Sequence, residues 1–367
     1  MRIGTITYWW TQTNYGQVLQ CYALIHFLKQ MGHDAFLIRH DPVYEPPRLL
    51  SERFFSAIQY LLHPWRLKSR KYWNQLKIRE KEDILKHNRH FDDFKKKYIP
   101  STKVVTYDEL KNSAPTADAY ICGSDQIWGG LNPIYYLQFG KPHVKRLAYA
   151  PSMGGEVPPS TVLKRIKRFL SDFDFISARE KSDIRILKNM GFSDACLVPD
   201  PTLLLGSFDY RKLATNKLND SERYVLVYLL GNQIDLSYDD LKSFAEEHGL
   251  KLKYVSSQGR IDDYEKLYPS IQEWLELVDK ATYVITNSFH GTVFSLLFNT
   301  PFLTLPVVGI KKKMNNRIID LLDRVGLSNR IYHHSLDEIL STINFDQFNK
   351  FRESESLRVS QIFSKMF

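Results

Sequence analysis

The clearest candidate for acid–base chemistry is His290, which lies where a short apolar run gives way to a polar turn. Residues 283–285 are typical of a buried strand, residues 286–288 suit a turn or a helix N-cap, and residues 292–298 predict a buried helix. This order places His290 at the carboxyl edge of a sheet, where open α/β folds bind ligands. An imidazole titrates near neutral pH, so it can act as a general acid or base. The alternative is a histidine that only caps the helix or packs in the core.

A second polar turn ends the first predicted strand, residues 2–10. Asn14 and Gly16 open a predicted helix at 17–31, and a strand at 35–39 completes a βαβ unit. The turn of this unit is another candidate ligand edge. Because it lacks a GxGxxG fingerprint, a nicotinamide cofactor is disfavoured.

Other residues at predicted strand ends are candidates for contact with a substrate. Asp125 follows a predicted strand at 117–123 and would either orient an acceptor or cap a helix. Trp10 and Trp128 could stack on a sugar ring, with Asn14 beside them, although aromatic residues at such places are at least as often part of the core.

The elements that position these residues alternate between short apolar runs and amphipathic helices through both halves of the chain. The pattern predicts two doubly wound, Rossmann-like α/β domains that face each other across a cleft. We expect an N-terminal domain at 1–205 with a basic helical insert at about 42–101, a linker at 206–222, a C-terminal domain at 223–345 and a terminal helix at 346–367.

Composition is that of a folded globular protein with a preference for anionic partners. The 367 residues carry a net charge of +9, with 43% hydrophobic and 25% charged residues. The three cysteines, Cys21, Cys122 and Cys196, are widely spaced and indicate neither a disulfide framework nor a zinc site. No run of about 18 apolar residues is present, so we expect a cytoplasmic protein without a membrane span, and we expect no metal.

Much of the positive charge lies in residues 66–97, which contain 12 Lys and Arg against 5 Asp and Glu. One interpretation is a solvated helical face. The other is peripheral attraction to an anionic membrane surface, where a lipid-linked acceptor would be found. Nucleic acid is disfavoured as a partner because no recognition motif accompanies the charge.

Six short motifs, taken together and in order, resemble the polysaccharide pyruvyl transferase family. The resemblance covers most of the chain, although the basic insert and the region after Pro306 are less distinctive. Each motif alone is weak, and the six are Asn14-Tyr15-Gly16, residues 123–128 (GSDQIW), residues 149–154 (YAPSMG), Ser177-Ala178-Arg179-Glu180, Asp200-Pro201-Thr202 and Ser288-Phe289-His290-Gly291.

The resemblance implies a fold similar to the GT-B glycosyltransferases and a ketal-forming reaction. The pyruvyl group of phosphoenolpyruvate would move to two hydroxyls of one sugar residue in surface polysaccharide biosynthesis, with phosphoenolpyruvate as co-substrate and no cofactor. It also implies that His290 acts in acid–base chemistry and that Arg179 holds phosphoenolpyruvate. Some family members have an arginine where this chain has Ser288, so either another cation replaces it or the donor differs.

A donor with a phosphate and a carboxylate needs at least one cation and, ideally, a helix N-terminus. The backbone amides that follow Ser288, at Gly291 and Thr292, are candidates for the second requirement. Lys312, with its neighbours at 311 and 313, and Arg317 are candidates to replace the missing arginine. The three lysines would otherwise be a solvated loop.

Three rival interpretations remain open. A GT-B-like glycosyltransferase that uses a nucleotide sugar would have the same cleft and the same basic edge. A non-catalytic protein that binds polysaccharide intermediates is favoured by Ser288 and disfavoured by Arg179 and His290. A nucleic-acid binder would show steeply salt-dependent affinity for DNA or RNA.

Overall fold

A computed structural model describes residues 1–44, 65–154, 157–215, 218, 222–232, 234–309 and 315–367, and only the backbone of residues 65–73. Lys312 therefore lies outside the described residues. So do residues 45–64 of the predicted insert and residues 216–217 and 219–221 of the predicted linker.

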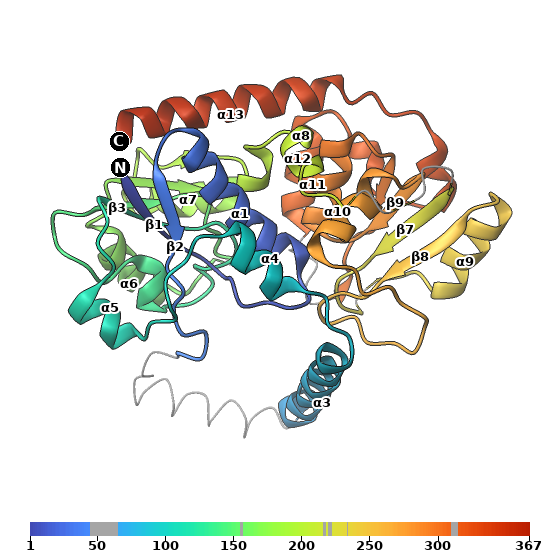
Figure 1. The fold of residues 1–367 in the computed structure, drawn as a ribbon, viewed down its shortest axis with the longest axis horizontal. Coiled ribbons are helices and arrows are strands. Elements are labelled where there is room, and N and C mark those ends of the chain that lie inside the picture. The colour runs from blue at the N-terminus through green and yellow to red at the C-terminus, as the bar shows by residue number, and fades with distance from the viewer. Residues whose placement is uncertain (45–64, 155–156, 216–217, 219–221, 233, 310–314) are drawn as a thin grey trace.

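The first half of the chain is built around a parallel sheet of six strands in the order β2-β1-β3-β4-β5-β6 (Figure 1). Because the strands are parallel, their carboxyl ends meet at one edge of the sheet. The strands are β1 (Arg2–Ile6), β2 (Asp34–Leu37), β3 (Ala119–Cys122), β4 (Lys145–Ala148), β5 (Phe175–Ala178) and β6 (Cys196–Leu197).

Helices connect these strands and surround the sheet. The α-helices are α1 (Tyr15–Gln30), α3 (Trp65–Lys86), α4 (Phe91–Tyr98), α5 (Tyr107–Ser113), α6 (Ser160–Leu170), α7 (Lys181–Asn189) and α8 (Ser207–Arg211). Two short 3-10 helices, η1 (Pro133–Tyr136) and η2 (Pro201–Leu203), follow β3 and β6.

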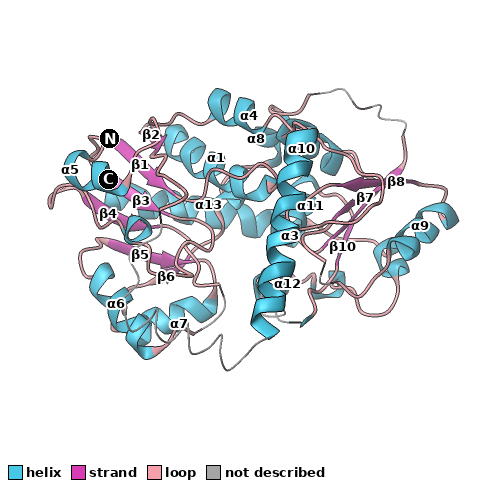
Figure 2. Cartoon of the chain, turned by 90° about the horizontal axis from the view of Figure 1, so that it is seen from below, coloured by secondary structure: helices cyan, strands magenta, loops and turns pink. Residues whose placement is uncertain are grey.

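The second half contains a smaller parallel sheet, in the order β10-β9-β7-β8. Its strands are β7 (Tyr224–Tyr228), β8 (Lys251–Val255), β9 (Tyr283–Thr286) and β10 (Phe302–Thr304). Its helices are α9 (Tyr238–Glu247), α10 (Ile271–Asp279), α11 (Phe289–Phe298), α12 (Asn316–Arg324) and α13 (Asp346–Met366), with the 3-10 helices η4 (Ser328–Arg330) and η5 (Leu336–Leu340). Figure 2 shows the two separate sheets with their helices, which confirms the predicted fold class.

The two halves are joined by a shared core. Tyr15, in the first turn of α1, is fully buried; its ring stacks on Trp274 of α10 at 5.0 Å between centroids, and its hydroxyl donates to the Pro269 carbonyl at 2.8 Å. At the other side, α13 runs along both halves (Figure 1), burying Phe348, Val359 and Phe363. One hydrophobic cluster therefore includes side chains from both sheets.

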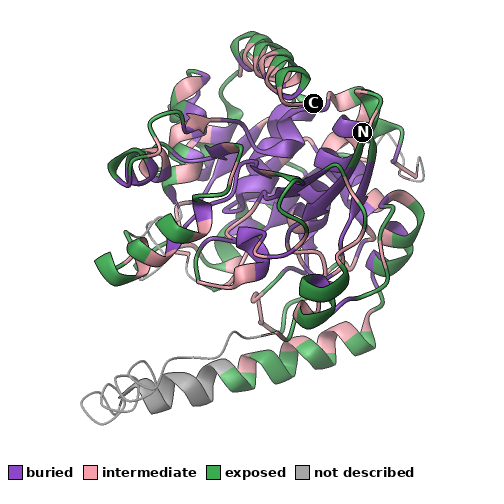
Figure 3. Cartoon of the chain, turned by 90° about the vertical axis from the view of Figure 1, so that its left-hand side faces the viewer, coloured by how far each residue is buried: buried purple, intermediate pink, exposed green. Residues whose placement is uncertain are grey.

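The basic segment forms two helices, α3 and α4, of which α3 projects from the body of the molecule (Figure 3). The C-terminal end of α3 is anchored through Arg89, which donates to Asp83 at 2.9 Å and to the Ser256 carbonyl at 3.1 Å. Within the described part of the chain, no helix is both long and apolar enough to cross a membrane.

Candidate active site

Arg179 follows directly after β5, at the carboxyl edge of the first sheet, and its side chain is only 3% exposed. Its Nη1 atom donates to Oδ2 of Asp200 at 2.6 Å, and its Nε atom donates to Oε1 of Glu180 at 3.1 Å. Burial opposes the charge of a guanidinium, but these two carboxylates raise the pKa of Arg179 above its usual range. The arginine is therefore a fixed cation with a defined orientation.

Asp200 follows β6 and is the completely buried acid of the site. Its Oδ1 atom accepts from the backbone and the hydroxyl of Thr202 at 3.0 and 2.7 Å. Burial would raise its pKa, but His290 and Arg179 outweigh burial and hold the pKa of Asp200 well below its usual range. Asp200 is thus a carboxylate that lies between an arginine and a histidine.

His290 lies in the first turn of α11, in the second half of the chain. Its Nε2 atom lies 3.6 Å from Oδ1 of Asp200, which belongs to the first half. The opposite nitrogen, Nδ1, faces Gly16 of α1 so closely that a Cβ atom on Gly16 would lie 2.1 Å from it. The imidazole is therefore held between α1 and Asp200, at the junction of the two halves.

Arg317, in the first turn of α12, brings a second guanidinium to the same place. Its Cζ atom lies 5.6 Å from the centre of the Phe289 ring, and Cζ of Arg179 lies 5.1 Å from the same centre. Burial first, and the charge of Arg179 second, lower the pKa of Arg317. Arg317 and Arg179 therefore lie near the same phenylalanine ring, and the replacement of an arginine at position 288 by Arg317 stays a prediction.

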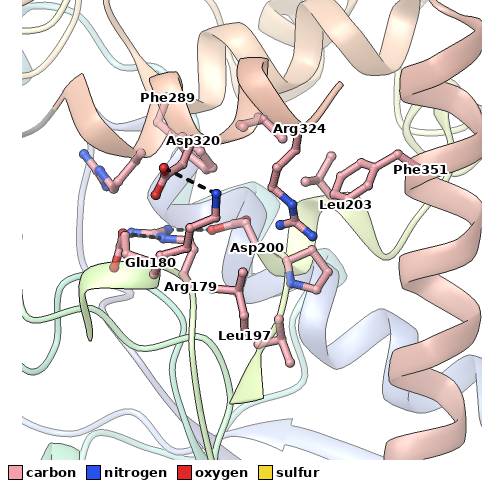
Figure 4. A pocket seen from close by; sticks show the side chains of 14 residues that line it. Arg179, Glu180, Leu197, Asp200, Leu203, Phe289, Asp320, Arg324 and Phe351 are labelled. Atoms are coloured by element: carbon pink, nitrogen blue, oxygen red, sulfur yellow. Dashed lines mark hydrogen bonds and ion pairs between the residues drawn. The ribbon is translucent and has the colours of Figure 1, made fainter. Parts of the chain in front are cut away.

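A pocket opens beside these residues, with walls from both halves and from α13 (Figure 4). Figure 4 shows Arg179 between Glu180 and Asp200 on one wall, and Asp320 and Arg324 of α12 on the other. Across the pocket, Lys181 and Asp320 form an ion pair at 4.0 Å. The remaining lining residues are Leu197, Val198, Pro199, Leu203, Phe289, Arg317, Leu321 and Phe351.

Two predicted donor-binding amides are already occupied, so that expectation is wrong. Ser288 is the N-cap of α11: its Oγ atom accepts from the Gly291 amide at 3.3 Å, and its carbonyl accepts from the Thr292 amide at 3.0 Å. Thr292 is fully buried, and Gly291 is required because a Cβ there would lie 2.3 Å from Oγ1 of Thr286. The glycine serves helix packing instead of ligand approach.

The three residues predicted to contact the acceptor differ in their burial and in their contacts. Trp128 is 1% exposed and stacks on Tyr136, so it belongs to the core and cannot stack on a sugar. Asn14 caps α1 and donates to Gln258 of the second half at 2.9 Å, which gives it a structural role. Trp10 is half-buried within a cluster of aromatic side chains.

Asp125 follows β3 at the carboxyl edge of the first sheet. It is half-buried, with a φ of 75°, and no helix begins at it, so the capping alternative fails. Its Oδ2 atom accepts weakly from Gln17 of α1 at 3.5 Å. Its charge acts on both Arg179 and Arg317. Asp125 therefore contributes negative charge near the two arginines, and its contact with a substrate stays a prediction.

Asp200 and Glu180 are the important residues that sequence reasoning did not assign to the site. Both occur in the quoted motifs, and the runs at 173–178 and 195–198 that precede them predict strands, so position alone could have suggested them. Ser124, which donates to Asp200 at 3.2 Å, belongs to the same group.

The chemistry available to this cluster is anion binding together with proton transfer. Within the described residues, Nη2 of Arg179, Nε of Arg317 and Nε2 of His290 are buried and have no hydrogen-bond partner. Buried N–H groups without an acceptor are costly, and an anion with several oxygens would satisfy them.

Comparison with solved structures supports the fold. A protein from Listeria monocytogenes described as a UDP-N-acetylglucosamine 2-epimerase aligns over 90% of each chain, with 9% identity and a TM-score of 0.50. The Methanocaldococcus jannaschii UDP-GlcNAc 2-epimerase aligns over 100% of both chains, with 11% identity and a TM-score of 0.48. The Escherichia coli heptosyltransferase WaaC aligns over 97% of this chain and 100% of its own, with 12% identity and a TM-score of 0.38. The fold is thus the predicted GT-B type.

Comparison of the sequence with protein families gives a more specific result. A search among curated proteins found no match. The family model described as polysaccharide pyruvyl transferase, however, matches residues 14–307, well over half of the chain, and this range contains Asp125, Arg179, Asp200 and His290. The chain therefore belongs to the polysaccharide pyruvyl transferase family.

Proposed function

We propose that the protein transfers the pyruvyl group of phosphoenolpyruvate to two hydroxyls of one sugar residue, forming a cyclic ketal. The main support is a pair of guanidinium groups near His290, each with one buried N–H group, Arg179 Nη2 and Arg317 Nε, that has no hydrogen-bond partner among the described residues. Phosphoenolpyruvate offers a phosphate and a carboxylate, which are the groups that arginine binds best.

In this proposal, the reaction has two steps that balance. A first sugar hydroxyl adds to C2 of phosphoenolpyruvate while C3 gains a proton and becomes a methyl group. A second hydroxyl of the same sugar then displaces phosphate from C2, so that C2 carries two C–O bonds to the sugar and inorganic phosphate leaves. His290 is proposed to accept and return the hydroxyl protons, with Asp200 stabilising its charged form.

Calorimetric titration with phosphoenolpyruvate tests the donor assignment. We expect saturable binding by the wild type, with affinity reduced about 100-fold in Arg179→Ala and about tenfold in Arg317→Ala, because each loses charge-assisted hydrogen bonds. Arg211→Ala is the matched control, because Arg211 also lies over a phenylalanine ring but is paired with Asp279 away from the site. Binding of a nucleotide sugar instead of phosphoenolpyruvate would contradict the proposal and favour a glycosyltransferase.

Mass spectrometry of saccharide acceptors tests the transfer itself. His290→Ala should bind phosphoenolpyruvate nearly as well as the wild type and yield no ketal product. Wild-type turnover in this variant on an acceptor that the wild type modifies would show that the assigned role of His290 is wrong.

We propose further that a lipid-linked acceptor is met at the membrane surface through α3. The described part of this helix exposes the cations Lys77, Lys81 and Lys86, together with Ile78 and Leu85, which are 58% and 77% exposed. Sedimentation with anionic vesicles should retain the protein, and changing the three lysines to glutamate should release it. Equal sedimentation with neutral vesicles would contradict an electrostatic contact.

A further inference from the structure

Two buried carboxyl groups meet at the start of α7, next to the proposed donor-binding arginine. Glu180 is the N-cap residue of α7 and Asp183 occupies the third helical position, so their side chains lie on the same side of the first turn. They are 4% and 0% exposed. Carboxyl groups are rarely buried so completely unless they are paired.

The hydrogen bonds of these two groups leave one oxygen on each without a donor. Glu180 uses Oε1 to accept from Nε of Arg179 at 3.1 Å. Asp183 uses Oδ2 to accept from the Met153 amide at 2.9 Å. Within the described residues, Oε2 of Glu180 and Oδ1 of Asp183 are both buried and receive no hydrogen bond if both groups are ionised.

A single proton between the two carboxyls satisfies both oxygens. A side-chain hydrogen bond between the two groups is one of the influences on the pKa of each, and two carboxylates form such a bond only when one of them is protonated. Glu180 faces the cations Arg179 and Arg317 and the hydroxyl of Ser152, which favour its ionised form. Asp183 accepts a hydrogen bond from the Met153 amide and also feels the charge of Arg179, but burial and the carboxylate of Glu180 outweigh both, so the proton belongs on Asp183.

The titration behaviour of the pair agrees with this geometry. Burial first, and the charge of Glu180 second, raise the pKa of Asp183 well above its usual range. Burial opposes the ionisation of Glu180, yet Arg179 above all holds the pKa of Glu180 below its usual value.

We propose that Asp183 is a neutral carboxylic acid in the folded protein and acts as a positioning residue for the donor site. It donates its proton to Oε2 of Glu180, and the carboxylate so held orients Arg179, leaving Nη2 free for an anion. The positioning role rests on the proposed function, whereas the protonation of Asp183 does not.

The proton itself is tested by infrared spectroscopy of the protein alone. At neutral pH the wild type should show the carbonyl stretch of a protonated carboxyl, and Asp183→Asn should lack it. Asp240→Asn is the matched control, because Asp240 is also the third residue of a helix but is exposed and bonded to Ser237. If the infrared spectrum of the wild type minus that of Asp183→Asn contains no carbonyl band of a protonated carboxyl, the proposal is wrong.

The positioning role is tested by phosphoenolpyruvate affinity as a function of pH. Asp183→Asn keeps a donor toward Glu180 and an acceptor for the Met153 amide, so it should match the wild type at neutral pH and lose less affinity at alkaline pH. Asp183→Ala should bind about tenfold more weakly even at neutral pH, because it leaves two buried groups unsatisfied. If wild type and Asp183→Asn lose the same amount of phosphoenolpyruvate affinity at alkaline pH, the positioning role is wrong.

Thermal unfolding separates this proposal from the proposed function and needs no ligand. A raised pKa in the folded state means that folding takes up a proton. The stability of the wild type should therefore fall as pH rises from the ordinary carboxyl range toward the folded pKa of Asp183, and Asp183→Asn should lack that fall. If the wild type does not bind phosphoenolpyruvate, the function fails, while the infrared and unfolding results still decide the protonation of Asp183.

Discussion

At the scale of single residues, the site is an alternation of charges across the junction of the two halves. Arg179 and Asp200 belong to the first half, and His290 and Arg317 to the second. Removing one partner of a buried ion pair costs about 3–5 kcal/mol, because the remaining charge stays buried. The position of each group therefore depends strongly on the others, and substitutions in this cluster should not be additive.

Gly16→Ala should impair catalysis by displacing His290. The added Cβ would lie 2.1 Å from Nδ1 of the imidazole, so the ring must move. Alanine otherwise suits a helix better than glycine does. We expect turnover to fall about 100-fold, as for a catalytic group misplaced by about 1 Å, with a loss of about 1–3 kcal/mol in unfolding free energy from overpacking.

The control for this substitution is Gly130→Ala, because a Cβ at Gly130 would meet no atom within 4 Å. Steady-state kinetics and urea unfolding of both variants provide the check. Full turnover in Gly16→Ala would show that the tight contact with α1 does not position His290.

Asp200→Asn should destabilise the folded protein, most clearly at neutral pH. The pKa of Asp200 is lowered in the folded state, so its contribution is present above the ordinary carboxyl pKa of about 4 and is lost as pH falls below it. We expect a loss of about 3 kcal/mol in unfolding free energy at neutral pH, which shrinks in acid. Urea unfolding of wild type and Asp200→Asn at neutral pH and at acid pH measures this loss. A loss of unfolding free energy that is the same at both pH values would contradict this account.

At the scale of elements, α13 is a brace that runs from one half to the other. Arg358 of α13 donates to the Leu197 carbonyl at 2.9 Å, and Ser356 donates to the Leu204 carbonyl at 2.8 Å, both in the first half. Phe363 is fully buried, with its ring centroid 6.4 Å from that of Phe27 in α1 and 5.4 Å from that of Tyr149. The helix therefore fastens the end of β6, which Asp200 follows three residues later.

Phe363→Ala should lower the unfolding free energy by about 3–5 kcal/mol, the usual cost of deleting a buried phenylalanine side chain. Leu357→Ala, on the same helix but at a position that is 62% exposed, should change it by less than about 0.5 kcal/mol. Chemical denaturation measures both. Equal effects would show that α13 does not pack as described.

The sequence predicted most elements because their periodicity and caps are local properties. The periodicity of residues 271–279, for example, predicts a helix, and α10 has the same bounds. Strand ends are predicted less accurately: the sequence of residues 146–152 predicts a strand, but β4 ends at Ala148 because Ala150 has a φ of 54° and Pro151 follows it. Helix α5 was missed although Thr106 and Glu109 form a capping box.

The site was only partly predictable for a different reason. His290 could be singled out because it follows a predicted strand, which is a local pattern, whereas Arg179 could be singled out through the resemblance of its motif to the family. The contact of Gly16 with His290 and the approach of Arg317 to Phe289 depend on how the two halves pack, which no local pattern encodes. The prediction for Gly291 failed because its close neighbour, Thr286, is visible only in three dimensions.

At the scale of the whole molecule, the two halves behave as one packed body. Tyr15 of the first half is buried against Trp274 and Tyr228 of the second. Glu80 of α3 accepts from Thr13 at 3.2 Å and from the Gly259 amide at 3.3 Å, so it also bridges the halves. Because the core is shared, the halves should not unfold separately.

Wild-type protein should accordingly unfold in one cooperative thermal transition, with equal calorimetric and van't Hoff enthalpies. Tyr15→Ala removes a stacked ring and a hydrogen bond at the junction. It should separate two transitions and so make the van't Hoff enthalpy smaller than the calorimetric enthalpy. Tyr15→Phe keeps the ring and should retain one transition. Two transitions in the wild type would contradict a shared core.

The buried charge cluster also bears on how this protein would respond to selection for heat resistance. Replacing buried ion pairs with apolar side chains of similar volume often raises stability by about 1–4 kcal/mol. Arg179, Asp200 and the Glu180–Asp183 pair are therefore positions where apolar substitutions should raise the stability of the fold. A laboratory search that rewards only thermostability should lose these residues early, and a natural relative that melts unusually high should first be checked for whether it still has them.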